Sequence, residues 1–239
     1  MPLSSLAADV RTYLHDLVSL VYPSLCVACQ NRLLTGEQFI CLPCLYDLPE
    51  TQYEKHKDNI VTRILGGRFP FEDAAALYFF NKGLHVQHIM HALKYDGQTD
   101  LGIFLGKLMG QKLMDSPYFQ QIDGIIPVPL HPKKLKERGY NQSEFLAKGI
   151  SDIMNVPLLP EALQRSQYTS SQTRKTRVER WENVAEGFEV TNKTTLQHKH
   201  ILVVDDVLTT GATLEAVVHP LVYKAQAKVS IACFALADG

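Results

Sequence analysis

The sequence of 239 residues has no apolar run near the roughly 18–20 residues that cross a bilayer, so we expect no membrane span. We also expect no secretory signal, because charged residues such as Asp9 and Arg11 interrupt its first apolar stretch. We therefore expect a cytoplasmic protein with reduced thiols. There is no charge excess either. With a formal net charge of −1, any contact with nucleic acid must come from a local patch.

A phosphate-binding loop of the ATPase type is missing as well. The nearest approach is Gly102-x3-Gly106-Lys107, which is one residue too short, lacks the following Ser or Thr, and lies in a helical stretch. Hydrophobic residues make up 46% of the chain and charged residues 21%, which is ordinary for a globular protein. The sequence does not decide the oligomeric state.

Cysteines are few, but four of the five are grouped. Two C-x2-C pairs are separated by eleven residues, a spacing that can direct four thiolates at one zinc ion. Disulfides and a redox pair are the alternatives, and the expected compartment and the duplication disfavour them. Four protein ligands leave no open position, so the zinc would be structural. The predicted ligands are Cys26, Cys29, Cys41 and Cys44.

The fifth cysteine, Cys233, lies in an apolar run and is expected to be a small core residue. Ahead of the cysteine pairs, apolar residues from Leu6 to Val21 recur at helical spacing. Residues 1–50 are therefore predicted to form a helix and a four-cysteine zinc module. The polar stretch 51–59 is interpreted as a linker, and 60–239 as the main domain.

The main domain alternates strand-like and helix-like segments, which predicts an α/β fold with a mostly parallel sheet covered by helices on both faces. Strands are expected at 74–80, 122–128, 201–204 and 229–236. Helices are expected at 84–95, 101–114, 143–154 and 214–224, the last with a bend at Pro220.

Residues 201–213 carry the strongest chemical signal. Four apolar residues form a buried strand, and Asp205 and Asp206 follow at its carboxyl end, where α/β sheets bind ligands. The next loop opens a helix and offers backbone N–H groups and hydroxyls to a phosphate, while Gly211 allows close approach. The carboxylates would accept hydrogen bonds from sugar hydroxyls and help to hold magnesium. The loop residues are Thr209, Thr210, Gly211, Ala212 and Thr213.

These thirteen residues match the type I phosphoribosyltransferase signature, and the rest of the chain resembles the ComF branch of that family. That branch pairs a four-cysteine zinc module with a transferase-like domain and is tied to DNA uptake. The further matching residues are Pro127 to His131, Arg138 to Gln142, Arg165, Gln172, Arg180, Asn183 and Phe188. The resemblance implies a type I phosphoribosyltransferase fold that binds phosphoribosyl pyrophosphate with Mg²⁺.

The resemblance also implies roles around this site. A pyrophosphate loop would consist of Val128, Pro129, Leu130 and His131, and a mobile loop would close over the ligand. Basic side chains in and near these loops would counter the pyrophosphate charge, unless they are merely solvated. They are Lys133, Lys134, Lys136, Arg138, Arg165, Arg174, Lys175, Arg177 and Arg180.

Two classes of function follow from this resemblance. One is a competence protein that binds phosphoribosyl pyrophosphate and handles single-stranded DNA together with DNA-uptake proteins. Bases would then stack on Tyr140, Tyr168 or Trp181. The other is an active phosphoribosyltransferase that displaces pyrophosphate with a base or an amine. The sequence shows no base pocket or glutaminase domain, so the nucleophile stays open.

Overall fold

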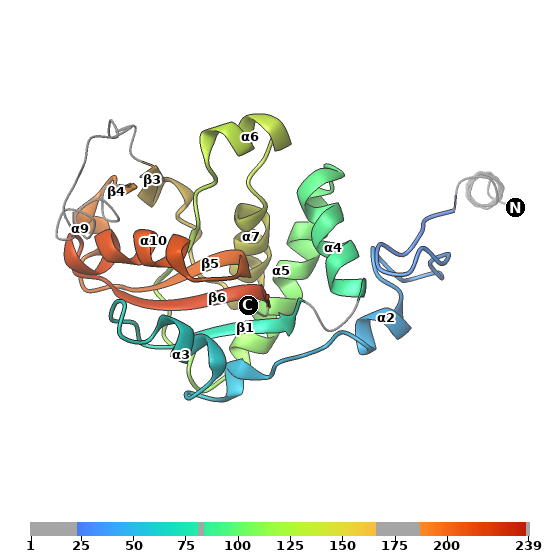
Figure 1. The fold of residues 1–239 in the computed structure, drawn as a ribbon, viewed down its shortest axis with the longest axis horizontal. Coiled ribbons are helices and arrows are strands. Elements are labelled where there is room, and N and C mark those ends of the chain that lie inside the picture. Colours follow the sequence, from blue (N-terminus) through green and yellow to red (C-terminus); the bar gives the residue numbers. More distant parts are fainter. Residues whose placement is uncertain (1–22, 81–83, 166–186, 238–239) are drawn as a thin grey trace, which may run out of the picture. The chain divides into compact units, whose positions relative to one another are not determined.

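The computed structural model describes residues 23–80, 84–165 and 187–237. The chain divides into two compact units, Met1–Leu48 and Pro49–Gly239. The larger unit is an α/β fold (Figure 1). Among the described residues, no helix is long and apolar enough to span a membrane.

A four-stranded parallel sheet forms the centre of the larger unit, in the order β1-β6-β5-β2. Its strands are β1 (Ala74–Phe79), β6 (Lys228–Leu236), β5 (His200–Leu208) and β2 (Gly124–Pro127). The two inner strands are almost entirely buried, as expected of parallel strands covered on both faces. The predicted fold class is confirmed.

The edge strand β2 is shorter than its neighbour β5, so the carboxyl end of β5 has a free side. β2 pairs with β5 only from Gly124 opposite Ile201 to Pro127 opposite Val204. β5 continues to Leu208 beside β6, so the segment after Val204 has lost one neighbour. We had predicted that the strand ends at Val204. It is longer because β6 supplies backbone partners up to Leu236.

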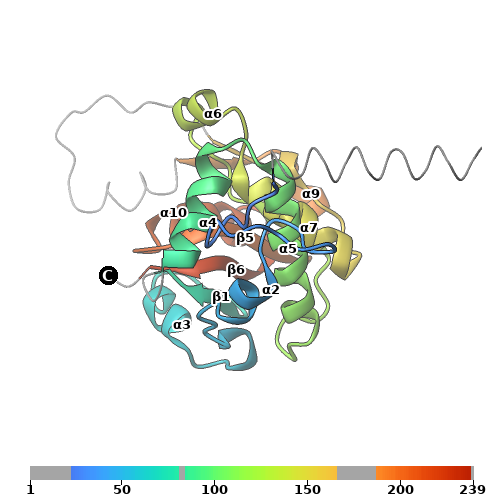
Figure 2. The ribbon, with the colours of Figure 1, turned by 90° about the vertical axis from the view of Figure 1, so that its right-hand side faces the viewer.

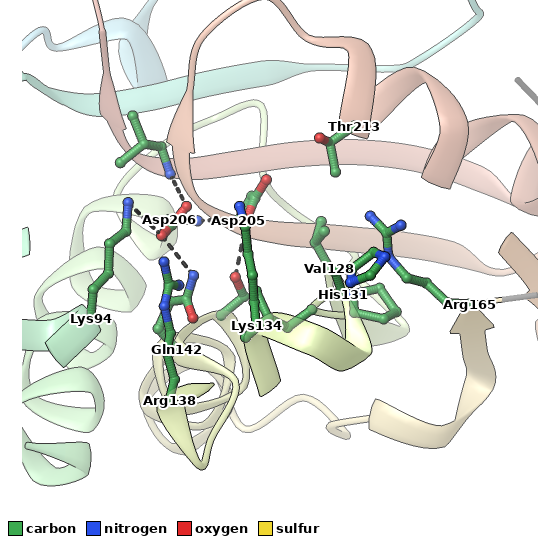
Figure 3. A pocket seen from close by; sticks show the side chains of 14 residues that line it. Lys94, Val128, His131, Lys134, Arg138, Gln142, Arg165, Asp205, Asp206 and Thr213 are labelled. Carbon is green, nitrogen blue, oxygen red and sulfur yellow. Dashed lines mark hydrogen bonds and ion pairs between the residues drawn. The ribbon is translucent and has the colours of Figure 1, made fainter. Parts of the chain in front are cut away.

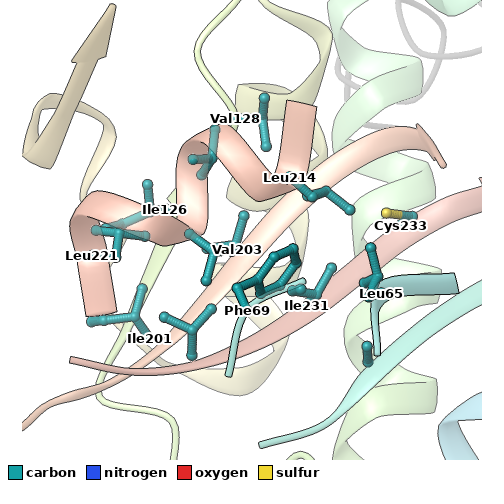
Figure 4. Close-up of a cluster of buried hydrophobic side chains, with 14 of the residues drawn as sticks. Leu65, Phe69, Ile126, Val128, Ile201, Val203, Leu214, Leu221, Ile231 and Cys233 are labelled. Atoms are coloured by element: carbon teal, nitrogen blue, oxygen red, sulfur yellow. The ribbon is translucent and has the colours of Figure 1, made fainter. Parts of the chain in front are cut away.

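One face of the sheet is covered by α3 (Ile60–Leu65) and α10 (Ala212–Tyr223). Leu65 and Leu214 from these helices join Val203 and Ile231 of the sheet in one apolar core (Figure 4). Cys233 belongs to this core and is fully buried, as predicted. Pro220 lies inside α10.

The opposite face is covered by helices α4 (Leu84–Tyr95), α5 (Thr99–Met114) and α7 (Gln142–Met154), of which α7 packs on β2 and β5 (Figure 2). α5 and α7 approach unusually closely. A methyl group at Gly106 would lie 2.1 Å from the Leu146 carbonyl oxygen, and one at Gly149 would lie 2.2 Å from the Ile103 carbonyl oxygen. The glycines near Lys107 therefore serve helix packing.

The segment interpreted as a linker is instead part of the larger unit. Glu50 forms an antiparallel bridge with Tyr78, and the Thr51 N–H donates to the Leu77 carbonyl at 2.9 Å. The segment continues through a 3-10 turn, η1 (Tyr53–Lys55), to Asn59, which caps α3. Its polar composition was misleading, because the side chains of Thr51 and Asn59 satisfy backbone groups of the sheet.

Shorter elements complete the described fold. α6 (Pro132–Arg138) follows β2, and the turn η2 (Pro160–Ala162) leads into a small antiparallel pair, β3 (Leu163–Arg165) with β4 (Phe188–Val190). A four-residue helix, α9 (Lys193–Leu196), precedes β5.

Candidate functional site

A cavity of about 200 Å³ lies where β5 extends beyond the last residue of β2 (Figure 3). Asp205 and Asp206 line it from β5, and the segment from Val128 to His131, which leaves β2, lines it from the side. The Val128 N–H still donates to the Val204 carbonyl at 2.9 Å, and the chain then departs from the sheet. The cavity thus lies at the carboxyl edge of the sheet, where parallel α/β folds bind ligands.

Asp205 is held by donors on one of its two carboxylate oxygens. Oδ1 accepts from Ser143 Oγ at 3.1 Å and from the Asp206 N–H at 2.9 Å. Burial and then the neighbouring charge of Asp206 raise the pKa of Asp205, which these hydrogen bonds and Lys94 lower, and the net result is a pKa of about 7. Asp205 can therefore exchange a proton near neutral pH, or accept a ligand donor or cation in its place.

Asp206 is buried and has more partners. Its Oδ2 lies 3.0 Å from Lys94 Nζ and accepts from Gln142 Nε2 at 2.8 Å. Its Oδ1 accepts from the Val207 N–H at 2.6 Å. The two adjacent carboxylates thus differ, because only that of Asp206 is directly paired with a cation among the described residues.

The loop predicted to bind phosphate links β5 to α10. Gly211 is in the left-handed region, with φ of 79°, and caps α10, while Thr209, Thr210, Ala212 and Thr213 are exposed. Of the five, Thr213 lines the cavity. The backbone N–H groups of this loop lie at the N-terminus of a twelve-residue helix, where they can donate hydrogen bonds to an anion.

The structure adds a second reason for glycine at residue 211, besides the predicted close approach of a phosphate. A methyl group there would lie 2.7 Å from Leu65 Cδ2 of α3, and the positive φ is strained for residues with a side chain. Arg68 supports the same loop, because its Nη1 donates to the Thr210 carbonyl at 2.6 Å.

The predicted pyrophosphate loop is fixed at both ends. Asn141 caps α7 and donates through Nδ2 to the Val128 carbonyl at 3.1 Å. His131 caps α6, and its Nδ1 accepts from the Lys133 N–H at 3.1 Å. Val128, Pro129, Leu130 and His131 all line the cavity.

Four lysine and arginine side chains from three elements of the described chain line the cavity: Lys94 of α4, Lys134 and Arg138 of α6, and Arg165 of β3. Arg165 ends β3, and its guanidinium stacks on the Phe188 ring at 4.6 Å. With two acids against four cations, the cavity suits an anion that also carries hydroxyl groups or a metal ion. Lys133, also predicted, is exposed and lies outside the lining. Arg177 and Arg180 lie outside the described residues.

Two residues of the site were not predicted. Lys94 comes from the last turn of α4 and Ser143 from the first turn of α7, far along the chain from the strand signature. Gln142 belonged to the motif but had no expected role. Ser143 directly follows the Arg138–Gln142 motif, so its position next to that motif was the one available signal. Nothing local marks Lys94.

The candidate metal centre lies in the smaller unit. The four Sγ atoms of Cys26, Cys29, Cys41 and Cys44 lie within 4.8 Å of one another, and those of Cys29 and Cys41 are 3.7 Å apart. Tetrahedral coordination with Zn–S bonds of about 2.3 Å places sulfurs about 3.8 Å apart. The described residues therefore fit a tetrahedral ion bound by four thiolates.

The backbone builds this cluster from two tight turns. In the first, the Gln30 N–H donates to the Cys26 carbonyl at 2.8 Å. In the second, the Cys41 N–H donates to Cys26 Sγ at 3.3 Å, and Cys41 also begins α2 (Leu42–Tyr46). Glu37 closes the intervening loop, because its carboxylate accepts from the Leu34 and Leu42 N–H groups at 2.7 and 2.8 Å.

Comparisons with known proteins agree with this architecture. Residues 141–239 match the phosphoribosyl transferase domain family. Competence protein ComFC of Bacillus subtilis is 30% identical over 212 residues, which cover 88% of this chain and 82% of that protein. DNA utilization protein YhgH of Escherichia coli O157:H7 is 26% identical over 229 residues, covering 90% and 97%.

Competence protein F of Haemophilus influenzae is 28% identical over 133 residues, covering 54% of this chain and 58% of that protein. The similarity to ComFC extends over most of both chains, and the matched domain contains both acids, the loop of residues 209–213 and α10. The chain belongs to the ComF family of proteins with a phosphoribosyltransferase-like domain.

Proposed function

We propose that the cavity binds phosphoribosyl pyrophosphate together with Mg²⁺, and that the protein acts in the use of DNA taken up by the cell. The main support is the juxtaposition of two adjacent acids on β5 with a phosphate-type loop at the start of α10 and four cationic side chains around them. Relatives that carry names of competence and DNA utilization support the second part.

In this proposal, each wall of the cavity would bind the part of the ligand that suits its chemistry. The 5′-phosphate would accept from the N–H groups of residues 209–213. The sugar hydroxyls would donate to the carboxylate of Asp205, whose Oδ2 has no donor among the described residues, and to that of Asp206. The pyrophosphate would lie beside the Val128–His131 segment, facing Lys134, Arg138 and Arg165.

Magnesium would be held by the ligand's phosphates, with the hydroxyl-binding acids as neighbours, and would neutralise negative charge on the pyrophosphate. Titration calorimetry with phosphoribosyl pyrophosphate tests the proposal, with and without Mg²⁺. We expect saturable binding that depends on the metal. Absence of heat with both ligands at millimolar concentration would refute it.

Turnover as a pentosyltransferase is the second candidate. The observation in its favour is the carboxyl group of Asp205, whose pKa of about 7 suits a group that accepts a proton from a nucleophile. Release of pyrophosphate in the presence of a panel of bases and amines would establish turnover. Binding without release would leave the protein a ligand-binding competence factor.

For the smaller unit we propose structural zinc, since four thiols fill the coordination shell. Elemental analysis of freshly prepared reduced protein should give about one zinc per chain. A different metal in stoichiometric amount, or none, would contradict this assignment.

Contact with single-stranded DNA is part of the proposed role, and the exposed cations of α6 are its candidates. Tyr140 does not suit base stacking, because its hydroxyl donates to the Leu93 carbonyl at 2.6 Å and its ring packs edge-on against Phe145. Tyr168 and Trp181 lie outside the described residues. Affinity for an oligonucleotide should fall steeply as salt rises. Affinity that is insensitive to salt would exclude the phosphate contacts.

A further inference from the structure

Lys94 differs from the other cations of the cavity. It lies in the last turn of α4, its Nζ is 3.0 Å from Asp206 Oδ2, and only 22% of its side chain is exposed. Lys134 and Arg138 come from the exposed helix α6 and have no ion pair with an acid among the described residues. The cavity therefore contains one cation that is already paired before any ligand arrives.

The acid that Lys94 meets is also bound by neutral donors. Gln142 donates to the same oxygen at 2.8 Å, and the Val207 N–H donates to the other oxygen at 2.6 Å. Gln142 is only 4% exposed, and its own Oε1 has no partner among the described residues. Asp206, Gln142 and the partly buried Lys94 thus form one connected unit at the cavity wall (Figure 3).

The position of Lys94 is fixed by its two chain neighbours. The Leu93 side chain is fully buried, and its carbonyl accepts from the Tyr140 hydroxyl at 2.6 Å. The Tyr95 ring lies 5.3 Å from the guanidinium carbon of Arg138. Tyr140 from the loop before α7 and Arg138 at the end of α6 therefore anchor the backbone turn that carries Lys94.

Two adjacent carboxylates in a cavity for an anion present an electrostatic problem. Unit charges about 4 Å apart repel by roughly 4 kcal/mol at an effective dielectric constant near 20. A ligand rich in phosphate would meet both acids unless one of them were neutralised inside the protein. Lys94 is placed to do so, since it is the one cation within 4 Å of either acid among the described residues.

We propose that Lys94 is the internal counter-ion of Asp206, a positioning residue that lets the acidic pair coexist with a polyanionic ligand. Asp205 then remains the acid with a free oxygen toward the cavity, while Asp206 is balanced by Lys94 and oriented by Gln142. The inference rests on the proposed binding of phosphoribosyl pyrophosphate. It differs from a role in which Lys94 contacts the phosphates directly, as Lys134 and Arg138 are placed to do.

A double-mutant cycle separates these two roles. The full-length variants are Lys94→Met, Asp206→Asn, the double variant and Lys94→Arg, and the probe is phosphoribosyl pyrophosphate with Mg²⁺ in titration calorimetry. We expect Lys94→Met alone to weaken binding by about tenfold or more, because an uncompensated charge faces the ligand. Lys94→Arg should retain most of the affinity. The double variant should bind at least several-fold more tightly than Lys94→Met.

The wild type, Lys94→Met, Asp206→Asn and the double variant are also unfolded in urea. The pairing predicts that Asp206→Asn costs less stability in the Lys94→Met background than in the wild type. Additive costs would overturn the inference, as would a double variant that binds no better than Lys94→Met. If the wild type binds no ligand, the proposed function fails, and the unfolding cycle alone then decides whether Lys94 is paired with Asp206.

Discussion

In the described part of the smaller unit, the buried apolar side chains besides the cysteines are Val27, Ala28, Ile40 and Leu48, while Leu34 and Tyr46 are 71% and 91% exposed. The larger unit has a continuous core on one face of its sheet and tightly packed helices on the other. The few buried apolar side chains of the smaller unit cannot stabilise its fold by themselves. The comparison indicates that the two units depend on different forces, hydrophobic burial in the larger unit and, in the smaller unit, the metal ligation proposed above.

Loss of a metal ligand should have the largest effect and should be confined to one unit. Cys44→Ser should abolish zinc binding and amide protection in residues 23–48, because metal-binding energy is folding energy in such modules. Protection in β5 and β6 should be unchanged. The measurement is hydrogen exchange with mass spectrometry, together with metal content.

Cys233→Ala is the matched control for this experiment. Cys233 is buried in β6, outside the cysteine cluster, so its loss should leave the zinc content intact. If Cys44→Ser retains stoichiometric zinc and normal protection, the proposed difference between the units does not hold.

The next largest effect should come from the loop at α10. Gly211→Ala places a methyl group 2.7 Å from Leu65 Cδ2 at a positive φ, so the buried Leu65 side chain, α3 or the loop must move. Gly139→Ala also has a positive φ, but nothing lies within 4 Å of its methyl group. Gly139→Ala should cost about 1 kcal/mol and Gly211→Ala about 2–4 kcal/mol in urea unfolding. Equal costs would mean that Leu65 does not constrain the loop.

The acidic pair should make the stability of the larger unit depend on pH. The pKa of Asp205 is about 7 in the folded protein and about 4 when unfolded, so the folded state holds an extra proton between these values. The free energy of unfolding should therefore fall as pH rises from 4 to 7, and level off above it.

Asp205→Asn removes this titration and should be more stable than the wild type at pH 8, by roughly 1–3 kcal/mol. The two proteins should converge near pH 4. A wild-type advantage at pH 8 would show that the carboxylate is not destabilised by burial beside Asp206. This pH dependence also distinguishes the two units, because unfolding of the cysteine module should not follow the titration of Asp205.

The smallest effect is expected at Arg68, which supports the phosphate-type loop from the turn after α3. Arg68→Ala loses the bond to the Thr210 carbonyl and should weaken ligand binding several-fold, at a cost of about 1 kcal/mol. Arg63→Ala, in the preceding helix α3, is the control, because its pair with Asp58 is solvent-exposed and contributes little. Equal affinities of the two variants would exclude a supporting role for Arg68.

Much of the larger unit could be predicted from the sequence, because its patterns are local. The helix at 84–95 was predicted with its observed ends, since Asp96 and Gly97 break the apolar periodicity. The strand at β6 was predicted to within one residue. The same logic failed for 51–59, where polar side chains serve the backbone of a neighbouring strand.

The site was predictable where its residues belong to recognisable sequence motifs. Asp205, Asp206 and the loop after them form a contiguous signature, and the Val128–His131 turn follows a recognisable strand. Lys94 reaches the same cavity from another helix, and only the tertiary fold brings it to Asp206. The role of Gly106 was hidden for a similar reason, since the partner that demands a glycine is forty residues away on α7.

The most direct test of the central claim is titration calorimetry of phosphoribosyl pyrophosphate with Mg²⁺ on the wild type and on Asp205→Asn. The Asn side chain replaces a negative acceptor by a neutral amide of nearly the same shape. We predict saturable wild-type binding and a loss of about 10- to 150-fold in the variant, which corresponds to about 1.5–3 kcal/mol for one charge-assisted hydrogen bond. No wild-type binding, or equal affinity of a folded Asp205→Asn protein, would contradict the account.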